Sequence, residues 1–416
     1  MKRRSNRSSP IKQEAIRLFG SGAIDTIESR GWDFLEGERS GDILRNHAGE
    51  DYLDCVSAFG VLNLGRRNAT LAQELKKAAS ETDQGNFPMI SKEKAELGEA
   101  LADFVPGHLD CAIFAVTRGE ALDAACKIAR GATERSVLVT EEGGWHGETG
   151  FSLTLSSRKD KFQFGPLIPD VEILPFEDET SMSLRIERGD VAAVVVESIQ
   201  VENHCRQHQS GFLRTVETLC RKHGTLFVVD ETQTGFGRTG HRFAFMEAGL
   251  TPDILVLGEA LGGGMFPIAA TLLTQEVNRF MNKHPMIHLS TFGGSDVGCR
   301  VALGALKLYE ELKPWDEARK LGDTLLASLE ESVKEKSSPL LGVSGCGALI
   351  SLRLSSREEA LRLCRGLSQR GVLAAPGELA EDAVVLRPPL TLGTKRTQEL
   401  ISVVKDALDE LTTESK

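Results

Sequence analysis

Five short runs of apolar residues mark the middle of the chain, and each ends in a polar or glycine-containing turn. Polar residues do not alternate with apolar ones inside these runs, so both faces of each strand should be covered, as in a parallel sheet between helices. The sequence therefore predicts an α/β fold with functional residues just after the carboxyl ends of the strands. The runs cover residues 112–116, 137–140, 191–196, 226–229 and 254–257.

The segments on either side of these runs have different patterns. Residues 31–54 alternate charge and glycine like short edge strands, and residues 70–104 have helical spacing of apolar positions. Beyond residue 297 the pattern predicts helices and short strands, which indicates a smaller α+β domain. We expect a segment 1–55 that contributes to the small domain, a large domain 56–300 and a C-terminal small domain 301–416. The C-terminal elements are predicted at 301–312, 315–336, 341–352, 358–370, 384–386 and 396–411.

Composition narrows the function classes. The 416 residues are 41% hydrophobic and 26% charged, which is typical of folded globular proteins, and the net charge of −11 disfavours nucleic acid as a partner. No apolar run is long enough to span a bilayer, and the basic N-terminus is not followed by the apolar stretch of a secretory signal. The eight cysteines form no Cys-x-x-Cys pair, and His204 and His208 have no evident third ligand. We therefore expect a cytoplasmic protein that binds neither membranes nor metal.

Polar residues follow two of the predicted strands directly. Asp230 begins the segment 230–240, Asp-Glu-Thr-Gln-Thr-Gly-Phe-Gly-Arg-Thr-Gly, and Glu259 precedes the glycines of residues 262–264. An acid at a strand end is by itself often only a turn or helix-capping residue. Other motifs along the chain make a functional role the better interpretation.

Taken together, these motifs resemble those of the class III aminotransferases, enzymes of fold type I that use pyridoxal 5′-phosphate (PLP). The likeness runs from about residue 31 to the C-terminus and is strongest for the branch that handles ornithine, putrescine and 4-aminobutyrate. It implies a large domain with a mainly parallel sheet and a smaller C-terminal domain. Besides residues 230–240, the motifs lie at residues 62–65, 119–121, 145–147, 197–200, 291–294 and 387–390.

The resemblance implies roles for several residues around the cofactor ring. The acid matching Asp230 keeps the pyridine nitrogen protonated, which makes the ring an electron sink. Trp145 matches the aromatic residue that stacks on the ring, and Gln233 matches the glutamine that contacts its phenolic oxygen. Glu197 matches a residue on the substrate side, and His146 follows Trp145 as a further candidate for proton transfer.

Two other matches concern the partner subunit and the substrate. The threonine matching Thr291 reaches the cofactor phosphate of the neighbouring subunit, which implies a homodimer with the pocket at its interface. The arginine matching Arg387 binds a substrate carboxylate. A strand-end arginine that only pairs with a surface acid is the structural alternative for Arg387.

The sequence departs from the family pattern where the cofactor is normally attached. The family has a lysine between Gly258 and Ala260, and this chain has Glu259, which cannot form a Schiff base. The glycine-rich turn that follows supplies no replacement, because residues 254–267 contain no lysine.

A second departure lies at the helix N-terminus that binds the cofactor phosphate in the family. Thr117, Arg118 and Gly119 replace its Ser-Gly-Thr there, and Arg118 adds a long cationic side chain. Because Asp230 and Glu259 should face each other, we expect Arg118 to neutralise one or both. Failing such a cation, one carboxyl group should have a raised pKa.

These departures predict an enzyme without a cofactor that acts on a small amino-acid-derived or amine substrate in a biosynthetic pathway. Glu259 would act as general acid or base, assisted by Asp230, Glu197 or His146, in a cyclisation, dehydration, condensation or hydrolysis. Two alternatives stay open. The protein could bind PLP, its amine form pyridoxamine phosphate (PMP) or a substrate adduct non-covalently, or it could be a non-catalytic scaffold.

Overall fold

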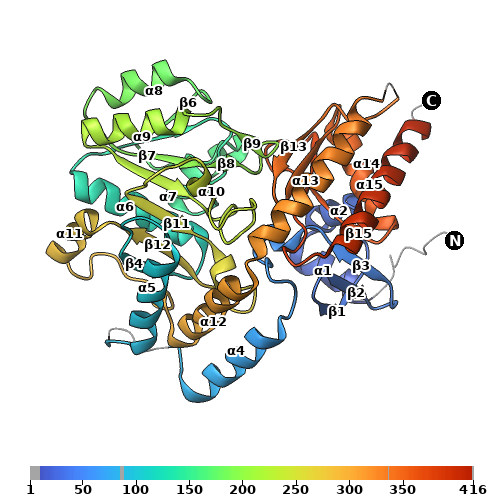
Figure 1. The fold of residues 1–416 in the computed structure, drawn as a ribbon, viewed down its shortest axis with the longest axis horizontal. Coiled ribbons are helices and arrows are strands. Elements are labelled where there is room, and N and C mark those ends of the chain that lie inside the picture. The colour runs from blue at the N-terminus through green and yellow to red at the C-terminus, as the bar shows by residue number, and fades with distance from the viewer. Residues whose placement is uncertain (1–9, 85–88, 336, 415–416) are drawn as a thin grey trace.

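The computed structural model describes residues 10–84, 89–335 and 337–414, and it has two lobes (Figure 1). The larger lobe contains the middle of the chain, and the smaller lobe brings both ends of the chain together. Residues 1–9 of the predicted basic tail lie outside the described residues.

A seven-stranded sheet forms the centre of the larger lobe and confirms the predicted α/β fold. The five predicted runs all form strands, and β11, β10, β7, β5 and β6 pair in parallel. Two strands, β6 and β12, were not predicted, and β12 runs antiparallel to both of its neighbours. The strand order is β4 (Cys111–Ala115), β12 (Ala269–Leu273), β11 (Ile254–Leu257), β10 (Leu226–Asp230), β7 (Val191–Glu197), β5 (Val137–Glu141) and β6 (Val171–Leu174).

Helices cover both faces of this sheet, as the continuous apolar strands require. On one face, the alanine-rich side of α6 packs against the small side chains of β7 and β4. On the other face, α5, α9 and α12 enclose a core that includes several aromatic residues. The helices of this lobe are α4 (Ala69–Glu81), α5 (Lys92–Phe104), α6 (Arg118–Thr133), α7 (Gly150–Leu155), α8 (Glu179–Ile186), α9 (Phe212–His223), α10 (Ala244–Glu247), α11 (Gln275–Lys283), α12 (Asp296–Leu312), and the 3-10 helices η1 (Lys159–Phe164) and η2 (Glu259–Gly262).

The smaller lobe joins segments from the two ends of the chain. One sheet contains β1 (Glu36–Ser40), β2 (Ile43–Asn46) and β3 (Asp51–Asp54), and β3 pairs with the distant β15 (Val372–Leu373). The predicted boundary at residue 300 falls inside α12, so the proposed domain division cuts one helix. The remaining elements are α1 (Pro10–Phe19), α2 (Ser21–Ser29), α13 (Pro314–Val333), α14 (Arg357–Gln369), α15 (Thr394–Glu414), and the sheet of β13 (Gly342–Cys346), β14 (Leu349–Arg353), β17 (Ala383–Leu386) and β16 (Ala375–Pro376).

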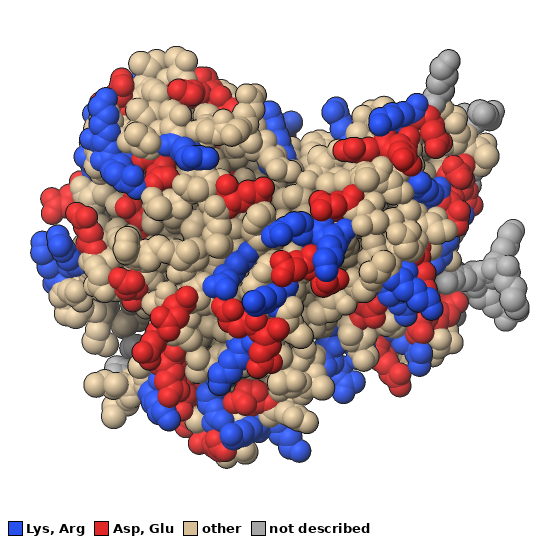
Figure 2. All heavy atoms as spheres, in the orientation of Figure 1, with Lys and Arg blue, Asp and Glu red and all other residues tan. Residues whose placement is uncertain are grey.

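The surface carries intermixed charges. Figure 2 shows acidic and basic side chains side by side over α4 and α12, where Arg300 pairs with Glu74 and Glu81. Among the helices of the described part, none is long and apolar enough to cross a membrane. All eight cysteines are free.

Candidate functional site

The ends of two neighbouring strands bring Asp230 and Glu197 together. Asp230 ends β10, Glu197 ends β7, and the two residues are partners in the register of these parallel strands. Asp230 is 2% exposed and Glu197 5% exposed, so both carboxyl groups lie in the protein interior. The site therefore starts at the carboxyl edge of the sheet, where the sequence predicts it.

His146 holds the carboxylate of Asp230. Its Nδ1 lies 2.8 Å from Asp230 Oδ2, and its Nε2 lies 3.2 Å from the hydroxyl of Thr140. A carboxylate can only accept, so Nδ1 carries the proton that it donates to Asp230. The other carboxylate oxygen accepts from the backbone N–H of Thr232 at 3.0 Å. Asp230 is thus fixed by partners on both oxygens, and His146 is buried as a positioning residue.

Glu197 is a buried carboxyl group of the site with a raised pKa, which the sequence did not predict for this residue. Burial, and after it the negative charge of Asp230, raise the pKa of Glu197 well above its ordinary value. Its Oε2 accepts from the backbone N–H of Trp145 at 2.8 Å, and this hydrogen bond opposes the rise only in part. Glu197 can therefore carry a proton at neutral pH next to an Asp230 that is held by His146.

Glu231, which follows Asp230, was not predicted as notable. It is fully buried and accepts hydrogen bonds from the backbone N–H of Phe245 at 2.7 Å and the hydroxyl of Thr234 at 2.5 Å. Burial raises the pKa of Glu231 to about 7. Its side chain supports the turn below the site.

Gln233 and Trp145 complete the inner wall of the site. Gln233 is 5% exposed, yet both polar atoms of its amide lack a hydrogen-bond partner within the described structure. Buried polar groups without a partner are rare in folded proteins, so this amide is a candidate ligand-binding group. A cavity of about 990 Å³ reaches Trp145, and the guanidinium of Arg158 lies 5.3 Å from the centre of its ring.

Glu259 and the N-terminus of α6 meet on the opposite side. Thr117 caps the helix, Arg118 is its first residue, and the backbone N–H of Arg118 donates to Glu259 Oε1 at 3.0 Å. Gly119 is buried where a Cβ atom would lie 2.8 Å from the hydroxyl of Thr149, so only glycine fits.

The expected neutralisation by Arg118 is not what the structure shows. Among the described residues, no carboxylate lies within 4 Å of the Arg118 guanidinium, and the counter-group of Asp230 is His146 instead. The physical reason is access, because His146 reaches Asp230 from the buried loop after β5 whereas Arg118 lies at a half-exposed helix start. Arg118 still acts at a distance, since its charge lowers the pKa of Glu197.

Arg387 lies at the end of β17 and pairs with Glu202, an acid that we did not predict. Arg387 Nη2 donates to Glu202 Oε1 at 2.6 Å, and both side chains are at most 2% exposed. The alternative of a surface ion pair is therefore wrong, because the partner is buried. Two nitrogens of Arg387, Nε and Nη1, have no partner in the described structure, and its guanidinium lies 5.3 Å from the ring centre of Phe59.

Phe59 belongs to a turn with unusual backbone geometry. In α3 (Ser57–Gly60) all four residues have positive φ angles, from 48° at Ser57 to 96° at Gly60. L-residues pay a steric cost in this left-handed region, and such segments persist where the surroundings hold them. The turn borders the site directly, because Gly60 also contacts the backbone of Gln233.

Thr291 is exposed in the single chain. The next glycines, Gly293 and Gly294, pack on Phe114 of β4 and fix the base of this segment. The predicted role of Thr291 toward a partner subunit therefore remains a prediction.

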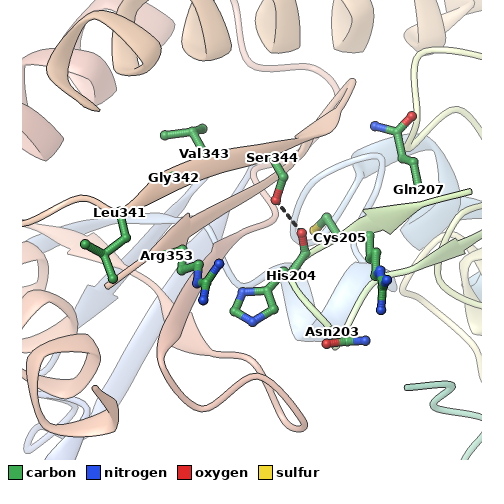
Figure 3. A pocket seen from close by; sticks show the side chains of 10 residues that line it. Asn203, His204, Cys205, Gln207, Leu341, Gly342, Val343, Ser344 and Arg353 are labelled. Carbon is green, nitrogen blue, oxygen red and sulfur yellow. Dashed lines mark hydrogen bonds between the residues drawn. The ribbon is translucent and has the colours of Figure 1, made fainter. Parts of the chain in front are cut away.

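A separate cavity of about 580 Å³ lies between the two lobes (Figure 3). The loop around His204 and Cys205 forms one wall, and β13 with Leu341 and Arg353 forms the other. Asp382 lies 3.3 Å from His204 and 3.6 Å from Arg353, so it balances the positive charge of this cavity. The side chain of His208 is 4% exposed, and its Nε2 lies 2.8 Å from Glu141 Oε2, so the two histidines do not share a site.

Comparisons with known proteins concern the whole chain. A family model described as "Aminotransferase class-III" matches residues 32–408. An "Uncharacterized aminotransferase" of Archaeoglobus fulgidus is 32% identical over 91% of this chain and 89% of its own length. A transaminase from a marine Virgibacillus is similar in structure with a TM-score of 0.91, at 20% identity over 98% of this chain and 100% of its own. The ornithine aminotransferase of Toxoplasma gondii is also similar in structure, with a TM-score of 0.88 at 23% identity over 99% of this chain and 100% of its own.

These findings overturn the expectation that the protein uses no cofactor. The family match makes PLP the expected cofactor. A further similar structure, that of an omega-transaminase of Pseudomonas jessenii, was solved in complex with PMP. Its TM-score is 0.85 at 21% identity, and the match covers 91% of this chain and 93% of that chain. The residues of this chain are compatible with the ring of such a group, since the carboxylate of Asp230 is fixed, Trp145 is buried and the buried amide of Gln233 has no hydrogen-bond partner in the described structure. The prediction failed because it weighed one attachment residue above this intact set.

Proposed function

This chain belongs to the class III aminotransferase family, and from that premise we propose that it is an enzyme that holds PLP or PMP by non-covalent contacts and acts on a small amine or amino acid. One observation carries the proposal. Asp230 is held by the buried His146, and the buried amide of Gln233 has no hydrogen-bond partner in the described structure, while Glu259 follows the end of β11 and residues 254–267 contain no lysine.

In this proposal the floor of the site holds the cofactor ring. Asp230 would bind the ring nitrogen, the amide of Gln233 would bind the phenolic oxygen, and Trp145 would lie against the ring. A cofactor held in this way would supply an electron sink for the bonds at the substrate carbon. His146 would hold the carboxylate of Asp230 in place.

Two carboxyl groups of this chain would move protons. Glu259 is half-buried at the end of β11, where the family has its lysine, and takes up or returns a proton at the substrate carbon. Glu197 has a raised pKa and a free Oε1, so it can donate a proton on the other side. In this proposal Glu259 acts as the general base and Glu197 as the general acid.

The pair of Arg387 and Glu202 would select the substrate. Arg387 has two unpartnered nitrogens in a buried position, which suits a planar carboxylate. Glu202 already neutralises Arg387, so a substrate carboxylate must share the guanidinium with it or displace it. An amine without a carboxylate leaves the pair intact, and both kinds of substrate are therefore compatible with the site.

We also propose that the protein is a homodimer with its pocket at the subunit interface. Large apolar side chains are exposed next to Thr291, at 57% for Ile287, 51% for Leu289 and 55% for Phe292. A second copy would cover this apolar segment and bring Thr291 toward the partner's site. Light scattering of Phe292→Ser should show more monomer than the unchanged protein.

Borohydride treatment with mass spectrometry tests the absence of a covalent link. The unchanged protein, saturated with PLP, should release all of it on dialysis and gain no pyridoxyl adduct in its cleft after reduction. Glu259→Lys should gain one adduct at residue 259, and Glu179→Lys, a matched change at an exposed helix start, should gain none there. Failure of PLP and PMP to bind, or an adduct on another cleft residue of the unchanged protein, contradicts the proposal.

A further inference from the structure

The carboxylate of Glu259 closes the N-terminus of α6. The first N–H groups of a helix have no partner inside the helix, and the helix dipole makes this end attractive to anions. The backbone N–H of Arg118 gives its hydrogen bond to Glu259, which lies 141 residues further along the chain. Glu120 Oε2 accepts a hydrogen bond from the backbone N–H of Val116 at 2.8 Å, so two carboxylates of this chain accept hydrogen bonds at the same helix start.

A phosphate group needs the same donors. Helix N-termini bind phosphate through their backbone N–H groups and the dipole, and the family resemblance assigns this helix start to the cofactor phosphate. One N–H cannot serve a carboxylate and a phosphate fully at once. A phosphate that arrives here also meets the negative charge of Glu259 at close range, and like charges at this distance repel strongly. Glu259 and phosphate therefore compete for one position.

The surroundings favour an exchange of anions over a permanent cap. The guanidinium of Arg118 has no carboxylate within 4 Å among the described residues, although its charge reaches Glu197. Gln233 is buried, and both polar atoms of its amide have no hydrogen-bond partner in the described structure, so the site offers a further polar group to a ligand. Glu259 itself is half-buried and begins a short 3-10 helix, which leaves its side chain room to turn away.

We propose that Glu259 is a displaceable internal anion, which caps α6 when the site is free and is replaced by the cofactor phosphate when the site is filled. Because phosphate must first displace Glu259, its binding is weakened. The displaced carboxylate is then free for the proton transfer that the proposed function assigns to it. Only that second consequence rests on the proposed function, because the competition for the Arg118 N–H concerns phosphate alone.

Calorimetric titration with inorganic phosphate tests the competition. Glu259→Ala, which removes the internal anion, should bind phosphate at least about 10-fold more tightly than the unchanged protein, since charge-assisted hydrogen bonds of this kind are worth a factor of this order. Glu259→Gln keeps an acceptor but loses the charge, so its affinity should fall between the two. The matched control Glu179→Ala removes an acid from the exposed start of α8 and should bind phosphate like the unchanged protein.

Thermal unfolding gives a second readout. Without phosphate, Glu259→Ala should unfold at a lower temperature than the unchanged protein, and phosphate should raise its unfolding temperature by more. Equal phosphate affinity in the unchanged protein and Glu259→Ala overturns the inference, as does weaker binding in the variant. If Glu259→Ala does not fold, the comparison of Glu259→Gln with the unchanged protein decides in the same way.

Titration with PMP separates this inference from the proposed function. If PMP binds the unchanged protein and Glu259→Ala with equal affinity, the proposed function stands and the displaceable anion does not. If PMP binds no variant while phosphate still favours Glu259→Ala, the anion competition stands and the proposed function fails. Tighter binding of both ligands to Glu259→Ala supports both.

Discussion

The floor of the site and its rim hold their carboxylates in opposite ways. On the floor, Asp230, Glu197, Glu202 and Glu231 are buried, and each accepts hydrogen bonds from fixed donors. At the rim, Glu259 is half-buried, and its one hydrogen bond in the described structure is accepted from the backbone N–H of Arg118. The difference teaches that the acids of the floor are held in place by the protein itself, whereas Glu259 at the rim can exchange its hydrogen-bond partner.

Breaking the buried pair of Arg387 and Glu202 should give the largest effect. Arg387→Met leaves Glu202 buried without its cation, and this should lower the free energy of unfolding by about 3–5 kcal/mol. The double change Arg387→Met with Glu202→Leu should recover most of the loss, because no unpaired charge remains. Urea denaturation measures both, and equal losses in the single and double variants would show that the charge is not the cause.

The pH dependence of stability tests Glu231, another buried acid of the floor. The pKa of Glu231 is about 7 in the folded protein against an ordinary value of 4.5, so the folded state binds more protons between these values. Stability should therefore fall as pH rises from 4.5 to 7, by about 3 kcal/mol for this residue. Glu231→Gln should remove this part of the slope in denaturation series at pH 5 and pH 8. An unchanged slope would assign the effect to another group.

Removing the charge of Asp230 should weaken cofactor binding. Asp230→Asn takes away the ionised partner of His146 and of the ring nitrogen, and the PMP affinity should fall by about 10–100-fold, the worth of a hydrogen bond to a charged group. Equilibrium dialysis measures this change. Asp253→Asn changes a half-buried acid that accepts from Phe227 N–H at the opposite end of the strands, and should leave PMP affinity unaltered.

The rim should show the smallest effect on stability. Glu259→Gln keeps an acceptor for the Arg118 N–H and loses only its favourable charge at the helix start, which costs less than about 1 kcal/mol of unfolding free energy. Chemical denaturation without phosphate checks this value. A loss as large as that of Arg387→Met would mean that the rim is as fixed as the floor.

The sequence predicted most of the sheet because its strands are long and apolar without interruption. It missed β12, whose apolar run is interrupted by Thr271 and follows a glycine-rich turn closely. Asp230 was predicted from its place after a strand, but its bond to His146 joins residues 84 positions apart that only the folded sheet brings together. Glu202 gave no signal, because it lies in a polar loop and its partner Arg387 comes 185 residues later.

The pairing of β3 with β15 has a consequence for synthesis of the protein. Backbone hydrogen bonds from Cys55 to Leu373 and from Arg387 to Cys55 support the segment just before the left-handed turn of residues 57–60. A nascent chain that has not yet emerged from the ribosome beyond residue 387 lacks this support, so the turn that borders the site is secured only after those residues have been made.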